Sequence, residues 1–199
     1  MKKLALLIAL FSSLATAGTL PAFADEQTAA PAKPAPRVID AKTLEDSVKT
    51  ALADMKTFKD EKSGYSVSYP SSWQLKEYEA PMCFKVFAFE GGVNVNSAVE
   101  EVPANATAQD YADAVKDFIA KKPEYNFKSI SETKVKVDGV DAVQRVQEMG
   151  DAEFMGRQLA VYFVKNNKAY TFNGTAESKE FPYFEPVFQK MVESIKLAN

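Results

Sequence analysis

The stretches Gln158–Lys165 (QLAVYFVK) and Lys168–Asn173 (KAYTFN) flank the dipeptide Asn166-Asn167. Two β-forming runs joined by two residues that tolerate a left-handed backbone are typical of a β-hairpin. Apolar side chains fall on both faces of the first run, with Leu159, Val161 and Phe163 on one face and Tyr162 and Val164 on the other. A strand that is apolar on both faces belongs in a sheet that is covered on both sides.

Two further hairpins are indicated by their turns. Asp138-Gly139 readily adopts the positive backbone angles of a tight turn, so the valine-rich runs on either side of it are predicted to pair. Gly91-Gly92 separates Cys83–Phe89 from Val93–Asn96 and predicts another pair. Connections this short require antiparallel neighbours.

Two helices interrupt or follow these strands. Thr107 and Asp110 have the spacing of a capping box at the start of one helix, and Pro123 is expected to end it. An apolar stripe at helical spacing indicates a second helix near the end of the chain, formed by Phe184, Phe188, Met191 and Ile195. The predicted fold class is α+β, with helices packed on an antiparallel sheet.

The chain divides into four segments. We predict a signal peptide over residues 1–24, an Ala/Pro-rich spacer over 25–39, a lead-in amphipathic helix over 40–57 and one folded domain over 58–199. The lead-in helix either packs on the domain or stands off as an interaction helix, and packing is the more usual arrangement. A chain of 199 residues fits one domain with such additions.

The N-terminal segment has the three parts of a secretory signal. Lys2 and Lys3 precede the apolar run Leu4–Leu14, and small residues stand at Ala22 and Ala24. A retained membrane helix is the alternative, but polar residues, a glycine and a proline interrupt the segment before it reaches the roughly 20 apolar residues of a span. We therefore expect a soluble protein that is secreted across the cytoplasmic membrane and is periplasmic or extracellular.

Composition excludes several kinds of chemistry. The chain has no histidine, so it lacks an imidazole base, a Ser-His-Asp triad and the usual zinc ligands. With 24 basic and 27 acidic residues it has no general charge attraction for nucleic acid. Cys83 is the one cysteine, and a buried apolar role suits it better than a reactive thiol, because no basic partner is evident.

Four aromatic residues are candidate contacts for a ligand or partner. Tyr69 and Trp73 could line a ligand groove, although their spacing also suits a corner of the core. Phe181 and Tyr183 would form an anchor for a partner if they remain exposed.

The sequence supports no catalytic, cofactor or metal site. Carboxylates cluster at Glu100-Glu101, Asp110/Asp113 and Asp151/Glu153, and solvated surface charge explains them better than paired acid-base catalysis. Asp138 and Asp141 are too few for a calcium loop and fit a hairpin turn.

Two stretches resemble the PsbP/Mog/DcrB-like superfamily. Gly64–Trp73 (GYSVSYPSSW) is similar to the opening of that family, and Ala169–Ala176 followed by a helix to Leu197 is similar to its ending. The resemblance covers roughly residues 58–197. It implies an α/β/α sandwich with a central antiparallel sheet, in a family of mostly accessory or binding proteins. None of the family's partner-binding residues has a matching position in this chain.

These observations lead to one functional hypothesis and two alternatives. The chain is expected to be a secreted, non-catalytic binding or accessory protein of the bacterial cell envelope. Its partner would be an unknown protein or envelope component, and we expect no cofactor, nucleic acid or membrane span after signal cleavage. The alternatives are a carboxylate-based hydrolase of envelope glycans and, from the resemblance, a metal-linked accessory protein like the photosystem members.

The predicted signal peptide can be tested by N-terminal sequencing. When the full chain is expressed in a bacterial host, the exported product should begin at Asp25, because Ala22 and Ala24 present small side chains to the signal peptidase. An exported product that retains Met1 would contradict the cleavage.

Overall fold

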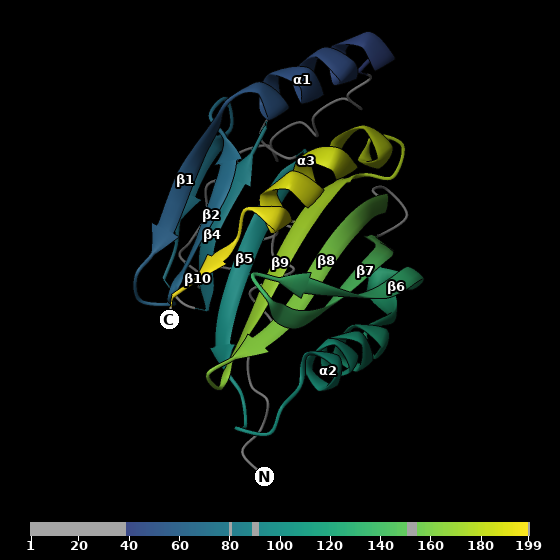
Figure 1. Ribbon diagram of the computed structural model, residues 1–199. Coiled ribbons are helices and arrows are strands. Elements are labelled where there is room, and N and C mark those ends of the chain that lie inside the picture. Colours follow the sequence, from purple (N-terminus) through teal and green to yellow (C-terminus); the bar gives the residue numbers. More distant parts are fainter. Residues whose placement is uncertain (1–38, 80, 89–91, 151–154, 199) are drawn as a thin grey trace, which may run out of the picture.

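The computed structural model describes residues 39–79, 81–88, 92–150 and 155–198. Seven strands form the main antiparallel sheet, in the order β3-β4-β5-β9-β8-β7-β6, and a small sheet has the order β1-β2-β10. Helices α1 and α3 lie on one side of the main sheet and α2 lies on the other (Figure 1). The elements are α1 (Ala41–Ala53), β1 (Met55–Asp60), β2 (Tyr65–Pro70), β3 (Gln74–Glu77), β4 (Met82–Phe87), β5 (Asn94–Glu101), α2 (Ala108–Ala120), η2 (Pro123–Tyr125), β6 (Lys128–Val137), β7 (Val140–Gly150), β8 (Met155–Lys165), β9 (Lys168–Glu177), α3 (Phe181–Glu193) and β10 (Lys196–Leu197).

The turn residues set the register of the central hairpins. Asn166 and Asn167 have φ values of 52° and 60°, and Asp138 and Gly139 have values of 47° and 81°. Two consecutive positive φ angles match the right-handed twist of the strands that they connect. All three predicted pairings are confirmed, as β8-β9, β6-β7 and β4-β5.

The central strand β8 is buried on both faces, as its sequence predicts. Leu159, Val161 and Phe163 join the core on the α3 side of the sheet. Ala160 and Tyr162 join a second core beneath α2. The expected α+β sandwich is confirmed, and the alternating side chains of β8 contribute to both of its cores.

Helix α1 is shorter than the lead-in helix expected over 40–57. It ends at Ala53, and Met55 begins a strand that pairs with β2. Phe58 is buried in this strand, with its ring 5.0 Å from that of Phe84. Pairing with β2 and this aromatic contact outweigh the helical propensity of residues 54–57, so the folded unit begins before residue 58.

The same helix packs on the domain instead of standing off. Leu44 and Ala51 are buried, and α1 lies against α3. The Nζ atom of Lys190 on α3 donates a hydrogen bond to the carbonyl oxygen of Leu52, over 2.8 Å. Apolar contacts and one capping bond therefore fix α1 in place.

Helix α2 begins and ends as expected. The side chain of Thr107 accepts a hydrogen bond from the Asp110 backbone N–H, and the carboxylate of Asp110 accepts one from the Thr107 backbone N–H. This reciprocal pair satisfies two donors at the helix start. The helix stops at Ala120, and Pro123 begins the short η2 turn.

Some expectations lie outside the described residues. These are the signal peptide, most of the spacer, Gly91 of the Gly91-Gly92 turn, and Asp151 and Glu153. Within the described ranges, none of the helices combines the length and the apolar character that a bilayer crossing requires.

Gly174 allows α3 to approach β9 closely. A Cβ atom at this position would lie 2.4 Å from Cγ of Phe188, whose ring is fully buried. Gly174→Ala should therefore lower the free energy of unfolding by about 1–3 kcal/mol, because the packed ring has no free space into which to move. Urea unfolding measures this loss.

The double variant Gly174→Ala/Phe188→Leu is the control for this steric contact. A smaller side chain at position 188 should make the added methyl group less costly than it is beside phenylalanine. Equal costs in the two backgrounds would contradict the contact.

Candidate functional site

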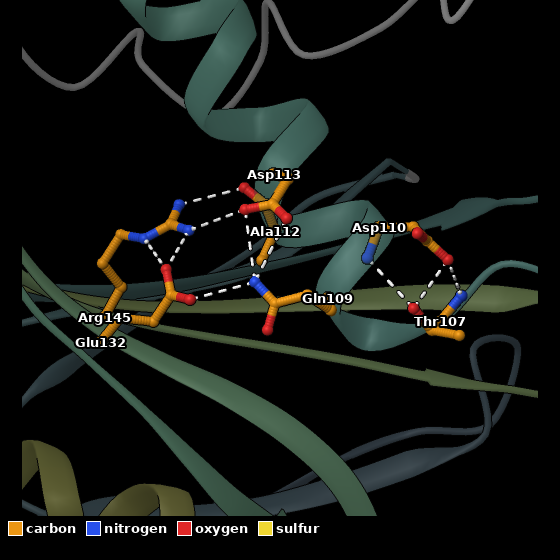
Figure 2. A network of polar contacts seen from close by, with 7 residues as sticks. All are labelled: Thr107, Gln109, Asp110, Ala112, Asp113, Glu132 and Arg145. Carbon is orange, nitrogen blue, oxygen red and sulfur yellow. Dashed lines mark hydrogen bonds and ion pairs between the residues drawn. The ribbon is translucent and has the colours of Figure 1, made fainter.

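The most polar cluster on the α2 side of the sheet surrounds Arg145 (Figure 2). Arg145 lies on β7 and is fully buried. Its Nη2 and Nε atoms lie 2.5 Å and 3.0 Å from Oε2 of Glu132, and Nη2 lies 3.6 Å from Asp113. Its Nη1 atom donates to the carbonyl oxygen of Ala112 over 3.0 Å. The guanidinium therefore connects β6, β7 and α2.

The positive charge of buried Arg145 is balanced by nearby carboxylates and hydrogen-bond acceptors. Hydrogen bonds from Arg145 and then from Gln109 hold the pKa of Glu132 below its ordinary value. The amide nitrogen of Gln109 lies 3.0 Å from Glu132 and 3.3 Å from Asp113. A buried guanidinium with two carboxylates and a carbonyl acceptor is stable without a ligand. We interpret the Arg145 cluster as a clamp that fixes α2 to the sheet.

Next to the clamp lies a row of uncharged polar side chains, which we call the amide row. It consists of Asn94 on β5, Thr175 on β9, Gln158 on β8 and Gln147 on β7, and each is the cross-strand partner of the next. All four are buried. The Nε2 atom of Gln147 donates to Oε1 of Gln158 over 2.7 Å, and Nε2 of Gln158 donates to the hydroxyl oxygen of Thr175 over 3.0 Å.

Both ends of the amide row carry an acceptor without a partner. Oδ1 of Asn94 and Oε1 of Gln147 are buried and have no hydrogen-bond partner among the described residues. Leaving such a group unsatisfied costs about 1–3 kcal/mol. The row therefore contrasts with the clamp, because its hydrogen-bonding capacity is incompletely used.

Asn94 is buried, although it lies away from the main contacts of helix α2. Helix α2 packs chiefly on β7 and β8 (Figure 1). The hydroxyl of its Tyr111 donates to Glu100, which lies at the opposite end of β5 from Asn94. Phe87 is the cross-strand partner of Asn94 on β4. Lys85 lies one row away, and burial, together with the nearby Lys76, lowers its pKa.

Three of the four aromatic candidates lie in the core. Tyr69, Trp73 and Phe181 are buried, and the ring of Trp73 lies 6.3 Å from that of Phe184. Because Phe181 is buried, it does not provide the exposed anchor for a partner that the sequence left open. Tyr69 and Trp73 form a corner of the core, since both pack into the core on the α3 side.

Tyr183 is the candidate that remains near the surface. It is half-buried and lines a shallow groove of about 550 Å³ between α1 and α3. The other lining residues are Glu45, Val48, Lys49, Leu52 and Ala53. The groove is mostly aliphatic, and none of the buried side-chain polar atoms that lack a hydrogen-bond partner among the described residues lines it.

Cys83 has the environment of an unreactive thiol. It is buried, and burial raises its pKa to about 11. The sulfur lies 3.4 Å from the hydroxyl of Ser63. A protonated, enclosed thiol is a poor nucleophile.

Three of the described carboxylates in the candidate acidic clusters have structural contacts, and Glu101 is exposed. Glu100 accepts from Tyr111, Asp110 caps α2, and Asp113 faces Arg145. The candidate calcium residues form turn contacts: Asp138 binds the Leu197 backbone N–H, and Asp141 pairs with Lys136. Across the described ranges, no group of three Cys, Asp or Glu side chains could hold a metal ion.

The amide row was not predicted from the sequence. Asn94 alternates with valines in the sequence, and Gln158 begins the decisive hairpin, but single polar residues of this kind usually face solvent. Only the register of four strands places them in one line. The sequence did contain one signal. Each of these residues lies an even number of positions from an apolar residue of the α2-side core on the same strand, so its side chain is on the same face of the sheet.

Comparison with known proteins agrees with this architecture. A family model described as PsbP-like protein matches residues 41–197. The solution structure of cyanobacterial PsbP (CyanoP) from Synechocystis sp. PCC 6803 aligns with a TM-score of 0.57 and 18% identity, covering 73% of this chain and 93% of that one. LpqN of Mycobacterium tuberculosis, described as involved in cell envelope biogenesis, aligns with a TM-score of 0.54 and 12% identity, covering 83% and 100%. A search of curated proteins gives no match.

The clamp predicts a pH-dependent contribution to stability. Glu132→Gln keeps a hydrogen-bonding group but removes a charge facing Arg145, so we expect a loss of about 1–2 kcal/mol at pH 7, moderated by the partial exposure of Glu132. The folded state lowers the pKa of Glu132 from its ordinary 4.5. Its stabilising effect is therefore present above pH 4.5 and is lost as the pH falls through the lower folded-state value.

Urea unfolding of both proteins between pH 7 and pH 3 measures the difference. It should be largest at neutral pH and shrink on acidification. Glu101→Gln is the matched control, because Glu101 is exposed. A difference that is constant with pH would contradict the clamp.

Proposed function

The chain belongs to the PsbP-like protein family, and from this membership we propose that it is an exported, non-catalytic binding or accessory protein of the bacterial cell envelope. The proposal has two parts, the location and the absence of a reaction.

Residues 1–24 support the location. They combine a basic start, an apolar run and a small-residue cleavage region, and no cysteine stands near the cut to accept a lipid. LpqN, which shares the fold, is described as involved in cell envelope biogenesis. An envelope role for this chain is in keeping with both observations.

The amide row is the observation that carries the binding role. Its acceptors at Asn94 and Gln147 have no hydrogen-bond partner among the described residues, so a donor group of a ligand could satisfy them. The chain also contains no histidine. Uncharged amide side chains, in a chain without an imidazole base, are suited to recognition rather than to bond breaking.

The two alternatives have less support. A carboxylate-based hydrolase needs two acidic groups with separated roles, whereas Glu100, Asp110 and Asp113 each have a structural contact. A metal-linked accessory role like that of the photosystem members has no ligand set among the described side chains.

The proposed function can be tested with the purified exported protein. Immobilised protein should retain a component of an envelope extract, and Gln147→Met should reduce this retention, because the substitution removes an amide-row acceptor. Gln144→Met, on the opposite face of the same strand, should leave retention unchanged.

Two results would overturn the proposal. One is turnover of an envelope polymer by the purified protein that a single Asp or Glu substitution abolishes. The other is recovery of the full chain from the cytoplasm with Met1 in place.

A further inference from the structure

We infer that β6 is the surface through which two copies of this chain associate, with their β6 strands paired antiparallel about a two-fold axis at Thr133. The main sheets of the two copies then form one continuous sheet. The exposure of this edge, the charges along it and the position of α2 support the pairing. Association of this kind does not depend on the proposed function.

Strand β6 is a long and accessible edge of the main sheet. It stands at one end of the strand order and pairs with β7, and no second strand lies beside it among the described residues. Residues 128–134 and 136 are exposed, so another chain can reach them. The strand at the other end of the sheet, β3, has four residues, whereas β6 has ten. Of the described edge strands, β6 therefore has the longest row of backbone N–H and C=O groups available for pairing.

The side chains of β6 alternate between the two faces of the sheet. Glu132 and Lys134 face the α2 side, because their cross-strand partners Arg145 and Val143 do. Thr133, between them, faces the other side. Glu132 and Lys134 are thus neighbours of opposite charge on one face of the edge.

A bulge limits the part of β6 that can pair with a second copy. The register with β7 shifts between Ser129 and Ser131, so the regular ladder runs from Ser131 to Val137. Opposed side chains of a continuous sheet lie on the same face, so the two-fold axis must pass through a residue and not between two. Only an axis at residue 133, 134 or 135 pairs five or more residues of this ladder.

The charges select one of these three axes. With the axis at Thr133, Glu132 of each copy lies opposite Lys134 of the other, and both pairs are attractive. An axis at Lys134 would place the two copies of that lysine opposite each other. An axis at Val135 would place Lys134 opposite Lys136. Both of these arrangements are repulsive.

Lysines and bulges usually keep an edge strand unpaired. Along β6 they disfavour every register but one, so they restrict the pairing instead of preventing it. A two-fold pair uses the β6 edge of both copies, and it therefore ends at two chains and does not continue into a fibre.

The pairing would also cover an exposed apolar side chain. Ile130 is 44% exposed and adjoins Ser131, the first residue of the regular ladder. Ser131 would lie opposite Val135 of the second copy. The strand of the second copy therefore approaches Ile130 and removes part of its apolar surface from water.

A second copy fits beside β6 without a clash between helices. Helix α2 packs chiefly on β7 and β8, so its axis lies about one and a half strand spacings from β6. With strands about 4.8 Å apart, the α2 helices of the two copies would be about 19 Å from each other. A helix with its side chains is about 10–12 Å across, so both fit on the same face of the continuous sheet.

Analytical ultracentrifugation of the exported protein tests the association. The wild type should form a dimer in a concentration-dependent manner. Lys134→Glu should weaken dimerisation about tenfold or more, because two attractive pairs become two repulsive ones. Lys128→Glu is the matched control, since Lys128 is an exposed lysine of the same strand outside the paired segment, and this variant should dimerise like the wild type. Because both lysines are exposed, both variants should melt like the wild type.

Disulfide trapping locates the two-fold axis. Thr133→Cys would place two thiols on directly opposed residues, whose Cα atoms are about 4.5–5.5 Å apart, a separation that a disulfide can span. Ser131→Cys lies on the same face, but the two copies of residue 131 would be about 14 Å apart. A mild oxidant should therefore link the first variant and not the second. Cys83 does not interfere, because it is buried.

Four results would overturn the inference. A protein that remains monomeric up to millimolar concentration has no such interface. A dimer that Lys134→Glu leaves intact uses another surface, and a dimer that Ser131→Cys links as readily as Thr133→Cys has another axis. A monomer whose retention of an envelope component is abolished by Lys134→Glu would identify a different protein as the occupant of the edge.

Discussion

Burial of the central hairpin on both faces is the constraint on which the rest of the structure depends. Successive side chains of β8 pack into different cores, so both faces of the strand are buried. Each helix must therefore fit the face that it covers. Gly174 shows how close this fit is, because only the absence of a side chain at this position leaves room for the ring of Phe188. The sandwich is thus defined by matched surfaces rather than by the helices themselves, whose sequences alone would not specify where they pack.

Burial of both faces also determines how a polar side chain in the sheet affects stability. A polar side chain in a two-sided sheet must be paired or must reduce stability. Arg145 shows the paired case, since Glu132, Asp113 and a carbonyl oxygen surround its guanidinium. The amide row shows the other case, since the acceptors of Asn94 and Gln147 at its two ends have no hydrogen-bond partner in the part of the chain that the structure describes. Both clusters lie on one face of one sheet, and the difference in their hydrogen-bond satisfaction separates a structural element from a candidate site.

Local patterns were sufficient to predict much of the fold. The Asp138-Gly139 and Asn166-Asn167 turns, the Thr107 cap and the two-sided pattern of β8 all have causes within a few residues. Features that depend on distant partners were predicted poorly. Residues 55–57 form a strand because β2 pairs with them, and Phe181 is buried because the core extends to the start of α3. The amide row depends on the register of four strands, which no single stretch of sequence contains.

The last strand has a consequence for the order of events in folding. Strand β10 pairs with β2, and the backbone N–H of Ala198 donates to the carbonyl oxygen of Gly64. The small sheet is therefore complete only when residues 196–198 are present. A ribosome-bound chain still lacks this closing strand and the long-range pairing of β5 with β9. For a protein proposed to leave the cytoplasm, such late pairing would favour export before folding is complete.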